Sequence, residues 1–227
     1  MTETRDPNGG AKPVLAMIGG TGPLGSGLAR RLAAAGYAVI IGSRTAAKAE
    51  ATAAELAAEG LPVTGADNAT AARLGQAVFI TVPWSSQAAI LDDVGAQLAG
   101  KLVIDTTVPL VPPRVARVAL PAEGSAALAA QKRLGSAVRL VSAFHNVAAH
   151  KLNGGETIDC DVLVFGDDPK DRQLVIELAT AIGLDAVHAG PLANSVAAEA
   201  LTSVLIGINR NYKVDGAGIR ITGLKRD

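Results

Sequence analysis

The sequence has little of several features that would assign it to other classes of protein. Its single cysteine, Cys160, cannot form an intrachain disulfide, which favours a reducing, cytoplasmic compartment. Aromatic residues make up only 3% of the chain and hydrophobic residues 49%, so the core is expected to be aliphatic. Basic and acidic residues number 21 each, and this zero net charge argues against a nucleic-acid partner or an anionic membrane.

Other absences concern targeting and chemistry. The start, MTETRDPNGGAKP, lacks the apolar core of a signal peptide, and no run approaches the ~20 apolar residues of a membrane span. No cluster of His, Cys and Asp has metal-site spacing, and there is neither a G-x-S-x-G motif nor the Tyr-x-x-x-Lys pair of short-chain dehydrogenases. We therefore expect no membrane, no metal ion and no covalent catalysis.

From Val14 onward, short apolar runs alternate with longer alanine-rich stretches. Continuous apolar runs are typical of buried parallel strands, and the stretches between them have helix-forming residues and a glycine near the end. The pattern predicts an α/β fold with a Rossmann-type doubly wound, mostly parallel sheet and a small C-terminal extension of helix and strand. The expected strands are 14–18, 37–41, 77–82, 101–105, 138–143, 162–166 and 185–190.

The first expected strand leads into Gly20-Thr21-Gly22-Pro23-Leu24-Gly25, which spells G-x-G-x-x-G at the start of a helix. One glycine of such a motif makes a tight turn, one lets the backbone approach a pyrophosphate, and one lets helix and strand pack closely. The N–H groups and the dipole of the helix start attract the anion. The motif predicts a dinucleotide site; the alternative is a glycine turn needed only for packing.

NAD sites carry an acid about 20 residues further on, at the end of the second strand, for the ribose 2′-hydroxyl. Here that place is taken by Ser43, followed by Arg44, with Lys48 one helical turn later. A hydroxyl, a guanidinium and an ammonium would bind a 2′-phosphate that an acid would repel. The pattern predicts NADP(H). The alternative is that the two cations have no ligand and are only solvated at the start of a helix, although cations are unfavourable there without an anion.

Two residues are candidates for the electron acceptor's side of the site. His145 follows the strand 138–143 at the edge where substrates bind, and either orients a ligand or only packs in its loop. Trp84 follows Pro83 just past the strand 77–82, and either lies near a nicotinamide or anchors the core. Since no acid is evident, we expect no catalytic side chain and an acceptor that takes hydride without a strong proton donor.

From about Val14 to Leu224 the chain resembles the NADP-dependent reductases of the 8-hydroxy-5-deazaflavin coenzyme F-420. The first two shared segments occur in other NADP-binding Rossmann proteins as well, whereas the ordered set is much more particular to this family. The segments are GGTGPLGSGLA, GSRTAAKA, TVPWSSQA, VSAFHNVAAHKL, DCDVLVFGDD, AGPLANSVAAEALT and INRNYKVDGAGIRITGL.

The resemblance implies roles for particular residues. It implies pyrophosphate contacts from Thr21, Gly22, Pro23 and Leu24 beside Gly20, 2′-phosphate contacts from Ser43, Arg44 and Lys48, and a nicotinamide side formed by Val82, Val108 and Ala148. The deazaflavin would stack on the nicotinamide in a pocket shaped by the HNVAAHKL loop and the C-terminal segment, with Trp84, His145 and Asn146 as candidates. The loop departs from the archaeal pattern of threonine, a branched residue and proline, because Asn146-Val147-Ala148 stand there.

The sequence thus predicts a cytoplasmic homodimer or larger homo-oligomer that passes hydride directly between NADP(H) and F-420. Residues 1–12 are expected to be a disordered tail, 13–145 an NADP-binding Rossmann domain, and 146–227 a part that completes the acceptor site and the oligomer contacts. Two alternatives stay open: an NADPH-dependent reductase of another small acceptor (a flavin, imine or keto acid), and a non-catalytic NADP(H)-sensing protein.

Overall fold

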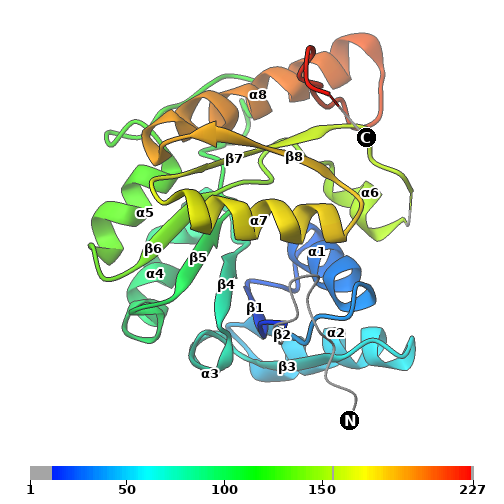
Figure 1. Cartoon of the computed structure of the whole chain (residues 1–227), viewed down its shortest axis with the longest axis vertical. Coiled ribbons are helices and arrows are strands. Elements are labelled where there is room, and N and C mark those ends of the chain that lie inside the picture. Colours follow the sequence, from blue (N-terminus) through cyan, green and yellow to red (C-terminus); the bar gives the residue numbers. More distant parts are fainter. Residues whose placement is uncertain (1–11, 155, 226–227) are drawn as a thin grey trace.

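The computed structural model describes residues 12–154 and 156–225, which form an eight-stranded sheet with helices on both faces (Figure 1). The strand order is β3-β2-β1-β4-β5-β6-β7-β8, and only the β6–β7 pair is antiparallel. The first six strands have the Rossmann order, which reverses between β1 and β4. The predicted fold class is therefore confirmed. The strands are β1 (Leu15–Ile18), β2 (Val39–Ser43), β3 (Val63–Asp67), β4 (Ala77–Ile80), β5 (Leu102–Asp105), β6 (Arg139–Ser142), β7 (Asp161–Gly166) and β8 (Asp185–Gly190).

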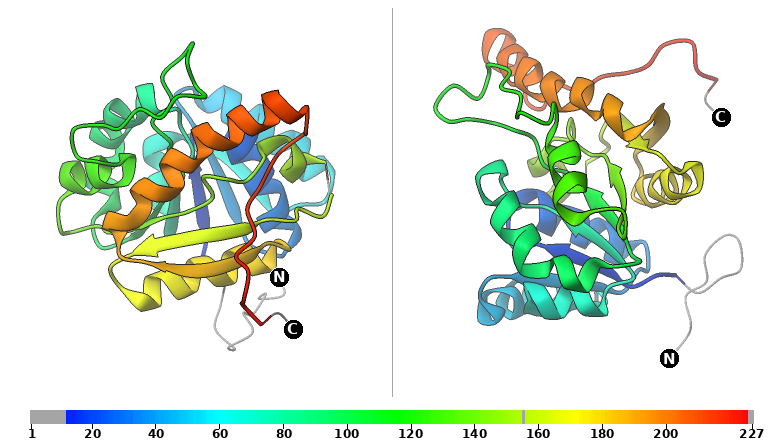
Figure 2. Two further views of the ribbon diagram at one scale, coloured as in Figure 1. Left: turned by 90° about the horizontal axis from the view of Figure 1, so that it is seen from above. Right: turned by 90° about the vertical axis from the view of Figure 1, so that its left-hand side faces the viewer.

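The helices form a layer on each face of the sheet, because side chains alternate along each strand. Leu15 and Met17 of β1 belong to the core cluster that also contains side chains of α1, α2 and α7, whereas Ala16 and Ile18 belong to the cluster with side chains of α3, α4 and α5. Figure 2 shows the two helical layers on either side of the sheet. The helices are α1 (Pro23–Ala34), α2 (Ala46–Ala58), α3 (Asn68–Leu74), α4 (Trp84–Leu98), α5 (Ala126–Leu134), α6 (Ala149–Asn153), α7 (Pro169–Ala181) and α8 (Ser195–Tyr212), with a 3-10 turn at Leu192–Asn194.

Strand β3 is a feature that the sequence pattern did not predict. It is an edge strand in which only Val63 is buried, so it lacks the continuous apolar run that marks the central strands. Gly65 lets helix α2 approach it, because a Cβ there would lie 2.4 Å from the backbone of Ala49. The helices α3, α5 and α6 were not predicted either.

The predicted domain division stays a prediction. The expected tail over residues 1–12 lies outside the described residues apart from Lys12, whose ammonium donates to the Ala35 carbonyl at 2.6 Å and lies 4.7 Å from the centre of the Tyr37 ring. The expected boundary at residue 145 follows β6, and the sheet continues beyond it with β7 and β8.

Helix α8 lies beyond the carboxyl end of β6, across the top of the molecule in Figure 1. By length and composition, Leu192–Tyr212 is the one helix of the described part that is apolar enough to cross a membrane, with 33% of its apolar window buried. The sequence analysis expected no run long enough for a membrane span. Its Glu199 is buried and bonded to helix α5, as expected of a helix that packs on a core, so the expectation of no membrane stays a prediction.

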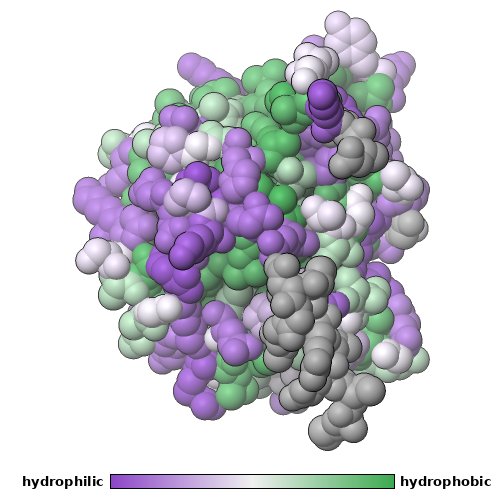
Figure 3. Space-filling view, in the orientation of Figure 1, coloured by the Kyte–Doolittle hydropathy of each residue, from purple (hydrophilic) through white to green (hydrophobic). Residues whose placement is uncertain are grey.

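Figure 3 shows polar residues over most of the face that α7 presents, and apolar residues gathered toward α8 at the top. The exposed large apolar side chains include Val204 on α8, Val118 and Leu120 on the loop before α5, and Val214 and Leu224 near the C-terminus. Apolar surface of this kind often marks a contact with another molecule.

Candidate functional site

A cleft of about 240 Å³ opens at the carboxyl ends of β1, β2 and β4, where the strand order reverses. Open α/β sheets bind ligands at this point. Six of the predicted nucleotide-binding residues line the cleft: Thr21, Gly22, Ser43, Arg44, Lys48 and Val82. The sequence analysis did not single out its other lining residues, which are Gly19, Thr45, Asn68, Thr81, Pro83, Ser86 and Ile90.

The three glycines of the motif have different surroundings. A Cβ at Gly20 would lie 2.7 Å from the Met17 carbonyl oxygen, and one at Gly25 would lie 2.6 Å from the Thr81 hydroxyl oxygen. These two glycines are therefore needed for packing. A Cβ at Gly22 would meet nothing closer than the Gly19 carbonyl oxygen at 3.6 Å. Gly22 thus leaves open space in the cleft, as close approach of a pyrophosphate requires.

Gly20, Pro23 and Leu24 do not line the cleft, although Gly20 belongs to the turn at its floor and the other two begin helix α1. The N–H of Gly20 donates to the carbonyls of Met17 and Gly42, both at 3.0 Å. Pro23 begins helix α1, which has no acidic residue in its first turn and no side-chain cap. The first N–H groups of a helix have no acceptor within it, so the start of α1 is suited to an anion.

The other end of the cleft is cationic. The Ser43 side chain is buried at the end of β2, while Arg44 and Lys48 are exposed at the start of α2. Among the described residues neither cation forms an ion pair, and the first turn of α2 contains no acid. A phosphate between them would meet two cations and a helix start. The residues present therefore fit the 2′-phosphate of NADP(H).

Asn68 is a part of the site that sequence reasoning missed. It is buried at the start of α3, and its side-chain oxygen accepts a hydrogen bond from the Gly19 N–H at 3.3 Å. It thereby ties the first turn of the floor to the end of the edge strand β3. No local pattern signals this contact, because the two residues are 49 positions apart.

The residues predicted along the nicotinamide follow the carboxyl ends of neighbouring strands. Val82 lines the cleft and packs over Gly19, where a Cβ would lie 2.4 Å from its Cγ1. Val108 follows β5, Ala148 precedes α6, and Trp84 begins α4 after β4. These last three do not line the cleft, but they lie at the same edge of the sheet.

Three buried polar atoms at this edge have no hydrogen-bond partner among the described residues: Oγ1 of Thr107, Nδ1 of His145 and Oδ1 of Asn146. Thr107 follows β5, the other two follow its neighbour β6, and the Asn146 amide nitrogen donates to the Asp161 carbonyl at 2.8 Å. Leaving a buried polar atom unpaired costs about 1–3 kcal/mol. The edge therefore fits a ligand with several polar atoms.

His145 is buried, and this burial keeps its imidazole neutral. Burial lowers its pKa to about 3, and its Nε2 lies 2.8 Å from the Ser142 hydroxyl oxygen. Phe144, just before it, has a φ of 67°, an unusual value for an aromatic residue and one that often occurs at functional sites. At neutral pH the ring can orient a ligand, but it carries no imidazolium proton to donate.

A pair of buried acids joins α8 to the sheet edge. Burial raises the pKa of Asp105 to about 6, while burial and then the charge of Asp105 raise that of Glu199 to about 7. Glu199 accepts hydrogen bonds from the N–H groups of Ala126 and Ala127 at 2.6 and 3.1 Å, and Gln87 donates to Asp105 at 2.6 Å. No local pattern in the sequence around Glu199 signals this contact.

These two pKa values predict a stability that falls as pH rises. Both are raised on folding, so the folded state binds more protons than the unfolded state from about pH 4 to about pH 7. Their favourable contribution to the free energy of unfolding is fully present below the pKa values of the unfolded chain. It is lost as the pH rises through the pKa values of the folded chain, at up to about 1.4 kcal/mol per pH unit for each proton. Glu199→Gln should flatten this decline in urea unfolding measured across that range.

The control for this measurement is Glu123→Gln. Glu123 is half-buried, and its pKa is lowered chiefly by its hydrogen bond with Lys132, so its replacement should leave the decline in place. An unchanged pH dependence in Glu199→Gln would contradict the assignment to the buried pair.

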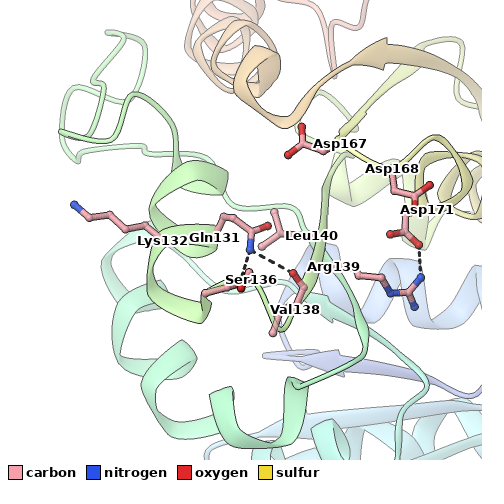
Figure 4. Close-up of a pocket in the computed structure, with 10 residues that line it drawn as sticks. Gln131, Lys132, Ser136, Val138, Arg139, Leu140, Asp167, Asp168 and Asp171 are labelled. Carbon is pink, nitrogen blue, oxygen red and sulfur yellow. Dashed lines mark hydrogen bonds and ion pairs between the residues drawn. The ribbon is translucent and has the colours of Figure 1, made fainter.

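A cavity of about 440 Å³ lies at the opposite edge of the sheet, between the end of α5 and the start of α7 (Figure 4). Its three acids all have partners: Asp171 pairs with Arg139 at 2.5 Å, Asp168 accepts from the Lys170 N–H, and Asp167 from the Leu192 N–H. Within the described ranges no group of three His, Cys, Asp or Glu side chains could hold a metal ion. The cavity thus offers a solvated ion-pair surface rather than a second reaction site.

Comparison with known proteins identifies the family. Residues 14–109 match the family model of coenzyme F-420-dependent NADP oxidoreductases. The F-420-dependent NADP reductase of Methanocaldococcus jannaschii is 38% identical over 93% of this chain and 99% of its own, and that of Methanothermobacter thermautotrophicus is 39% identical over 92% and 95%. A crystal structure of a candidate F-420-dependent NADP reductase from an Arthrobacter species superposes with a TM-score of 0.75, at 25% identity over 92% of this chain and 99% of that one. Since the archaeal relatives match along almost their whole length, this chain belongs to the family of F-420-dependent NADP oxidoreductases.

Proposed function

We propose that this protein transfers a hydride between NADP(H) and the deazaflavin coenzyme F-420. The observation that carries the proposal is the full-length match to the archaeal reductases, combined with a cleft whose ribose end is cationic and free of acids. The alternatives, another small acceptor or a non-catalytic NADP(H) sensor, are not favoured by these relatives.

When bound, the nicotinamide and the deazaflavin supply the hydride donor and acceptor, so no nucleophilic or basic side chain is required. The chain's own part is to bind and orient. In the proposal Arg44 and Lys48 hold the 2′-phosphate with Ser43, and the open backbone at Gly22 admits the pyrophosphate between the turn and the start of α1. The remaining proposed nucleotide contacts are Gly20, Thr21, Pro23, Leu24, Val82, Val108 and Ala148.

The proposed acceptor side uses the polar edge after β5 and β6. The unpaired Nδ1 of His145 and Oδ1 of Asn146 would take hydrogen bonds to the polar edge of the ring, with Thr107 beside them. Trp84, partly exposed at the start of α4, is the proposed apolar neighbour. A ring held between such groups is oriented without any proton transfer from the chain.

The proposal is tested by mixing the purified protein with NADPH and F-420 and following the absorbance of both. Equal molar loss of NADPH and oxidised F-420 is expected, with much slower loss of NADH. Flavin mononucleotide and a cyclic imine are the comparison acceptors. Turnover of either of these without turnover of F-420 would replace the proposal by the alternative reductase, and binding of NADPH without any turnover would favour a sensor.

His145→Ala is expected to lower kcat only about 10-fold, because it loosens the reacting geometry without removing a proton donor. The KM for the acceptor should rise by a larger factor, and both limbs of the pH profile of kcat should remain. A general acid is typically worth ~100–10,000-fold in rate. A thousandfold loss of kcat together with the disappearance of one limb would show that His145 donates a proton after all.

We further propose that the protein acts in the cytoplasm as a homodimer or larger homo-oligomer. The apolar side chains exposed on α8 and on the loop before α5 support a contact between copies, because no nearby element of the described chain covers them. Light scattering of the purified protein measures the mass directly, and a monomer would reject the oligomer.

A further inference from the structure

The proposed acceptor loop, residues 145–148, continues directly into α6, a helix of five residues. A helix this short is not stable by itself, so its position depends on what it packs against. It packs on α1, the helix whose first turn forms the nucleotide floor (Figure 1). Contacts between α1 and α6 therefore fix the distance between the floor and the loop.

Three positions of α1, spaced by four residues and hence on one face, make these contacts. At the floor end, the Pro23 carbonyl accepts a hydrogen bond from the Asn153 side chain at 2.9 Å. In the middle, a Cβ at Gly27 would lie 2.7 Å from the Cβ of the fully buried Leu152. At the far end stands Arg31.

The guanidinium of Arg31 donates hydrogen bonds to carbonyl groups at and just beyond the end of α6. Its Nε donates to the Leu152 carbonyl at 2.9 Å, and one terminal nitrogen donates to the Lys151 carbonyl at 2.8 Å and to the carbonyl of Glu156, just beyond α6, at 2.6 Å. The other terminal nitrogen makes a longer contact of 3.4 Å with the Ile182 carbonyl after α7. The last carbonyls of a helix have no partner within it and carry its negative dipole end, so a cation is the group that satisfies them best. A planar fork with several donors can serve more than one carbonyl at once.

The other side of α6 is closed by the C-terminal segment. A Cβ at Gly216 would lie 2.7 Å from the Cβ of Ala148, and His150 pairs with Asp215 at 2.9 Å. The loop and α6 are thus held between α1 and the C-terminal segment. On the α1 side, Arg31 makes more hydrogen bonds to this part of the chain than any other described residue.

We propose that Arg31 is a positioning residue, which fixes the acceptor loop relative to the nucleotide floor by binding the carbonyls at the end of α6. The proposal rests on the proposed hydride transfer to F-420 for its effect on activity, but its effect on the loop is independent of the acceptor's identity. Arg31 lies outside the cleft, so it acts on the acceptor through α6 without touching the nucleotide.

The test compares Arg31→Ala and Arg31→Lys with Arg30→Ala. Arg30, the preceding residue of α1, pairs instead with Glu59 at the end of α2 and is the matched control. Arg31→Ala should lower kcat/KM for F-420 by about 10- to 100-fold, the size expected of a misplacement near 1 Å, and raise KM for F-420 more than it lowers kcat. Its Kd for NADPH should stay within about twofold of the parent, and Arg31→Lys should fall between the two.

Hydrogen–deuterium exchange supplies a readout that needs no acceptor. In Arg31→Ala the amides of residues 145–154 should exchange at least about tenfold faster, while those of residues 18–27 stay unchanged, because only the segment that Arg31 anchors opens locally. Unchanged exchange in 145–154, or equal losses in NADPH and F-420 affinity, would overturn the proposal. If the parent protein does not reduce F-420 at all, the proposed function fails, and the exchange result alone decides the role of Arg31. Should Arg31→Ala not fold, Arg31→Lys carries both measurements.

Discussion

Gly22→Val is expected to abolish NADP(H) binding while the chain stays folded. Gly22 has φ −80° and ψ 164°, an extended conformation that valine adopts readily. A Cβ there would have 3.6 Å to its nearest neighbour, so the protein itself has room for the new side chain. The two methyl groups would instead fill the space above the turn that a pyrophosphate needs. We expect the affinity for NADPH to fall by more than about 100-fold, or roughly 2.7 kcal/mol.

Two further glycines make this result interpretable. Gly25→Val should destabilise the fold itself, because its Cβ would lie 2.6 Å from the Thr81 hydroxyl oxygen and 2.7 Å from the Gly20 Cα. Gly95→Ala on α4 should leave NADPH binding unchanged and should not destabilise the fold, since its Cβ would make an ordinary contact with Leu134 at 3.5 Å and alanine favours a helix interior. Titration calorimetry with NADPH and thermal unfolding measure the two properties separately. A folded Gly22→Val protein with normal affinity would show that this glycine serves only the turn.

Arg44→Ala is expected to weaken NADPH binding by about 1.5–3 kcal/mol, the range for a hydrogen bond to a charged group. The affinity for NADH should hardly change, because NADH has no 2′-phosphate for Arg44 to meet. The side chain is exposed and unpaired with any acid among the described residues, so the stability of the fold should be preserved. The measurement is the ratio of the Kd values for NADPH and NADH in the parent and the variant.

The charge of the contact gives a second signature. In the parent the preference for NADPH over NADH should shrink as salt is raised, since exposed charges are screened within about 8–10 Å at moderate ionic strength. In Arg44→Ala this salt dependence should be weaker. Lys132→Ala removes an exposed cation that pairs with Glu123 away from the cleft. It should change neither the ratio of the Kd values for NADPH and NADH nor the salt dependence of that ratio. Equal losses for both nucleotides in Arg44→Ala would reject the 2′-phosphate assignment.

The sequence by itself determined the fold class and the kind of nucleotide expected. Buried parallel strands must be apolar on both faces, so six of the eight strands appeared as mostly apolar runs. The edge strand β8, in which no residue is fully buried, was predicted without such a run. The glycine motif and the missing acid at Ser43 are local features, because a helix start and the end of the next strand bind one dinucleotide in a fixed order along the chain. The edge strand β3 was not predicted, because only Val63 is buried in it and the strand therefore has no continuous apolar run.

Only the tertiary structure decided which glycines of the G-x-G-x-x-G motif serve packing and which one leaves space for a ligand. Gly20, Gly22 and Gly25 are identical in the sequence, yet two of them pack against protein atoms and one faces open space. What surrounds a missing Cβ depends on the neighbouring strand and helix. The neutral state of His145 likewise results from its burial in the folded chain.

The contacts that hold the acceptor side were also beyond the sequence. Arg31 reaches a carbonyl 121 positions away, and Glu199 reaches the N–H of a residue 73 positions away. Every residue has a backbone carbonyl and almost every one an N–H, so the chain contains no pattern that marks which of them a distant side chain will meet. Periodicity reports which face of an element is buried, whereas the partner of a buried charge is decided only when the elements pack.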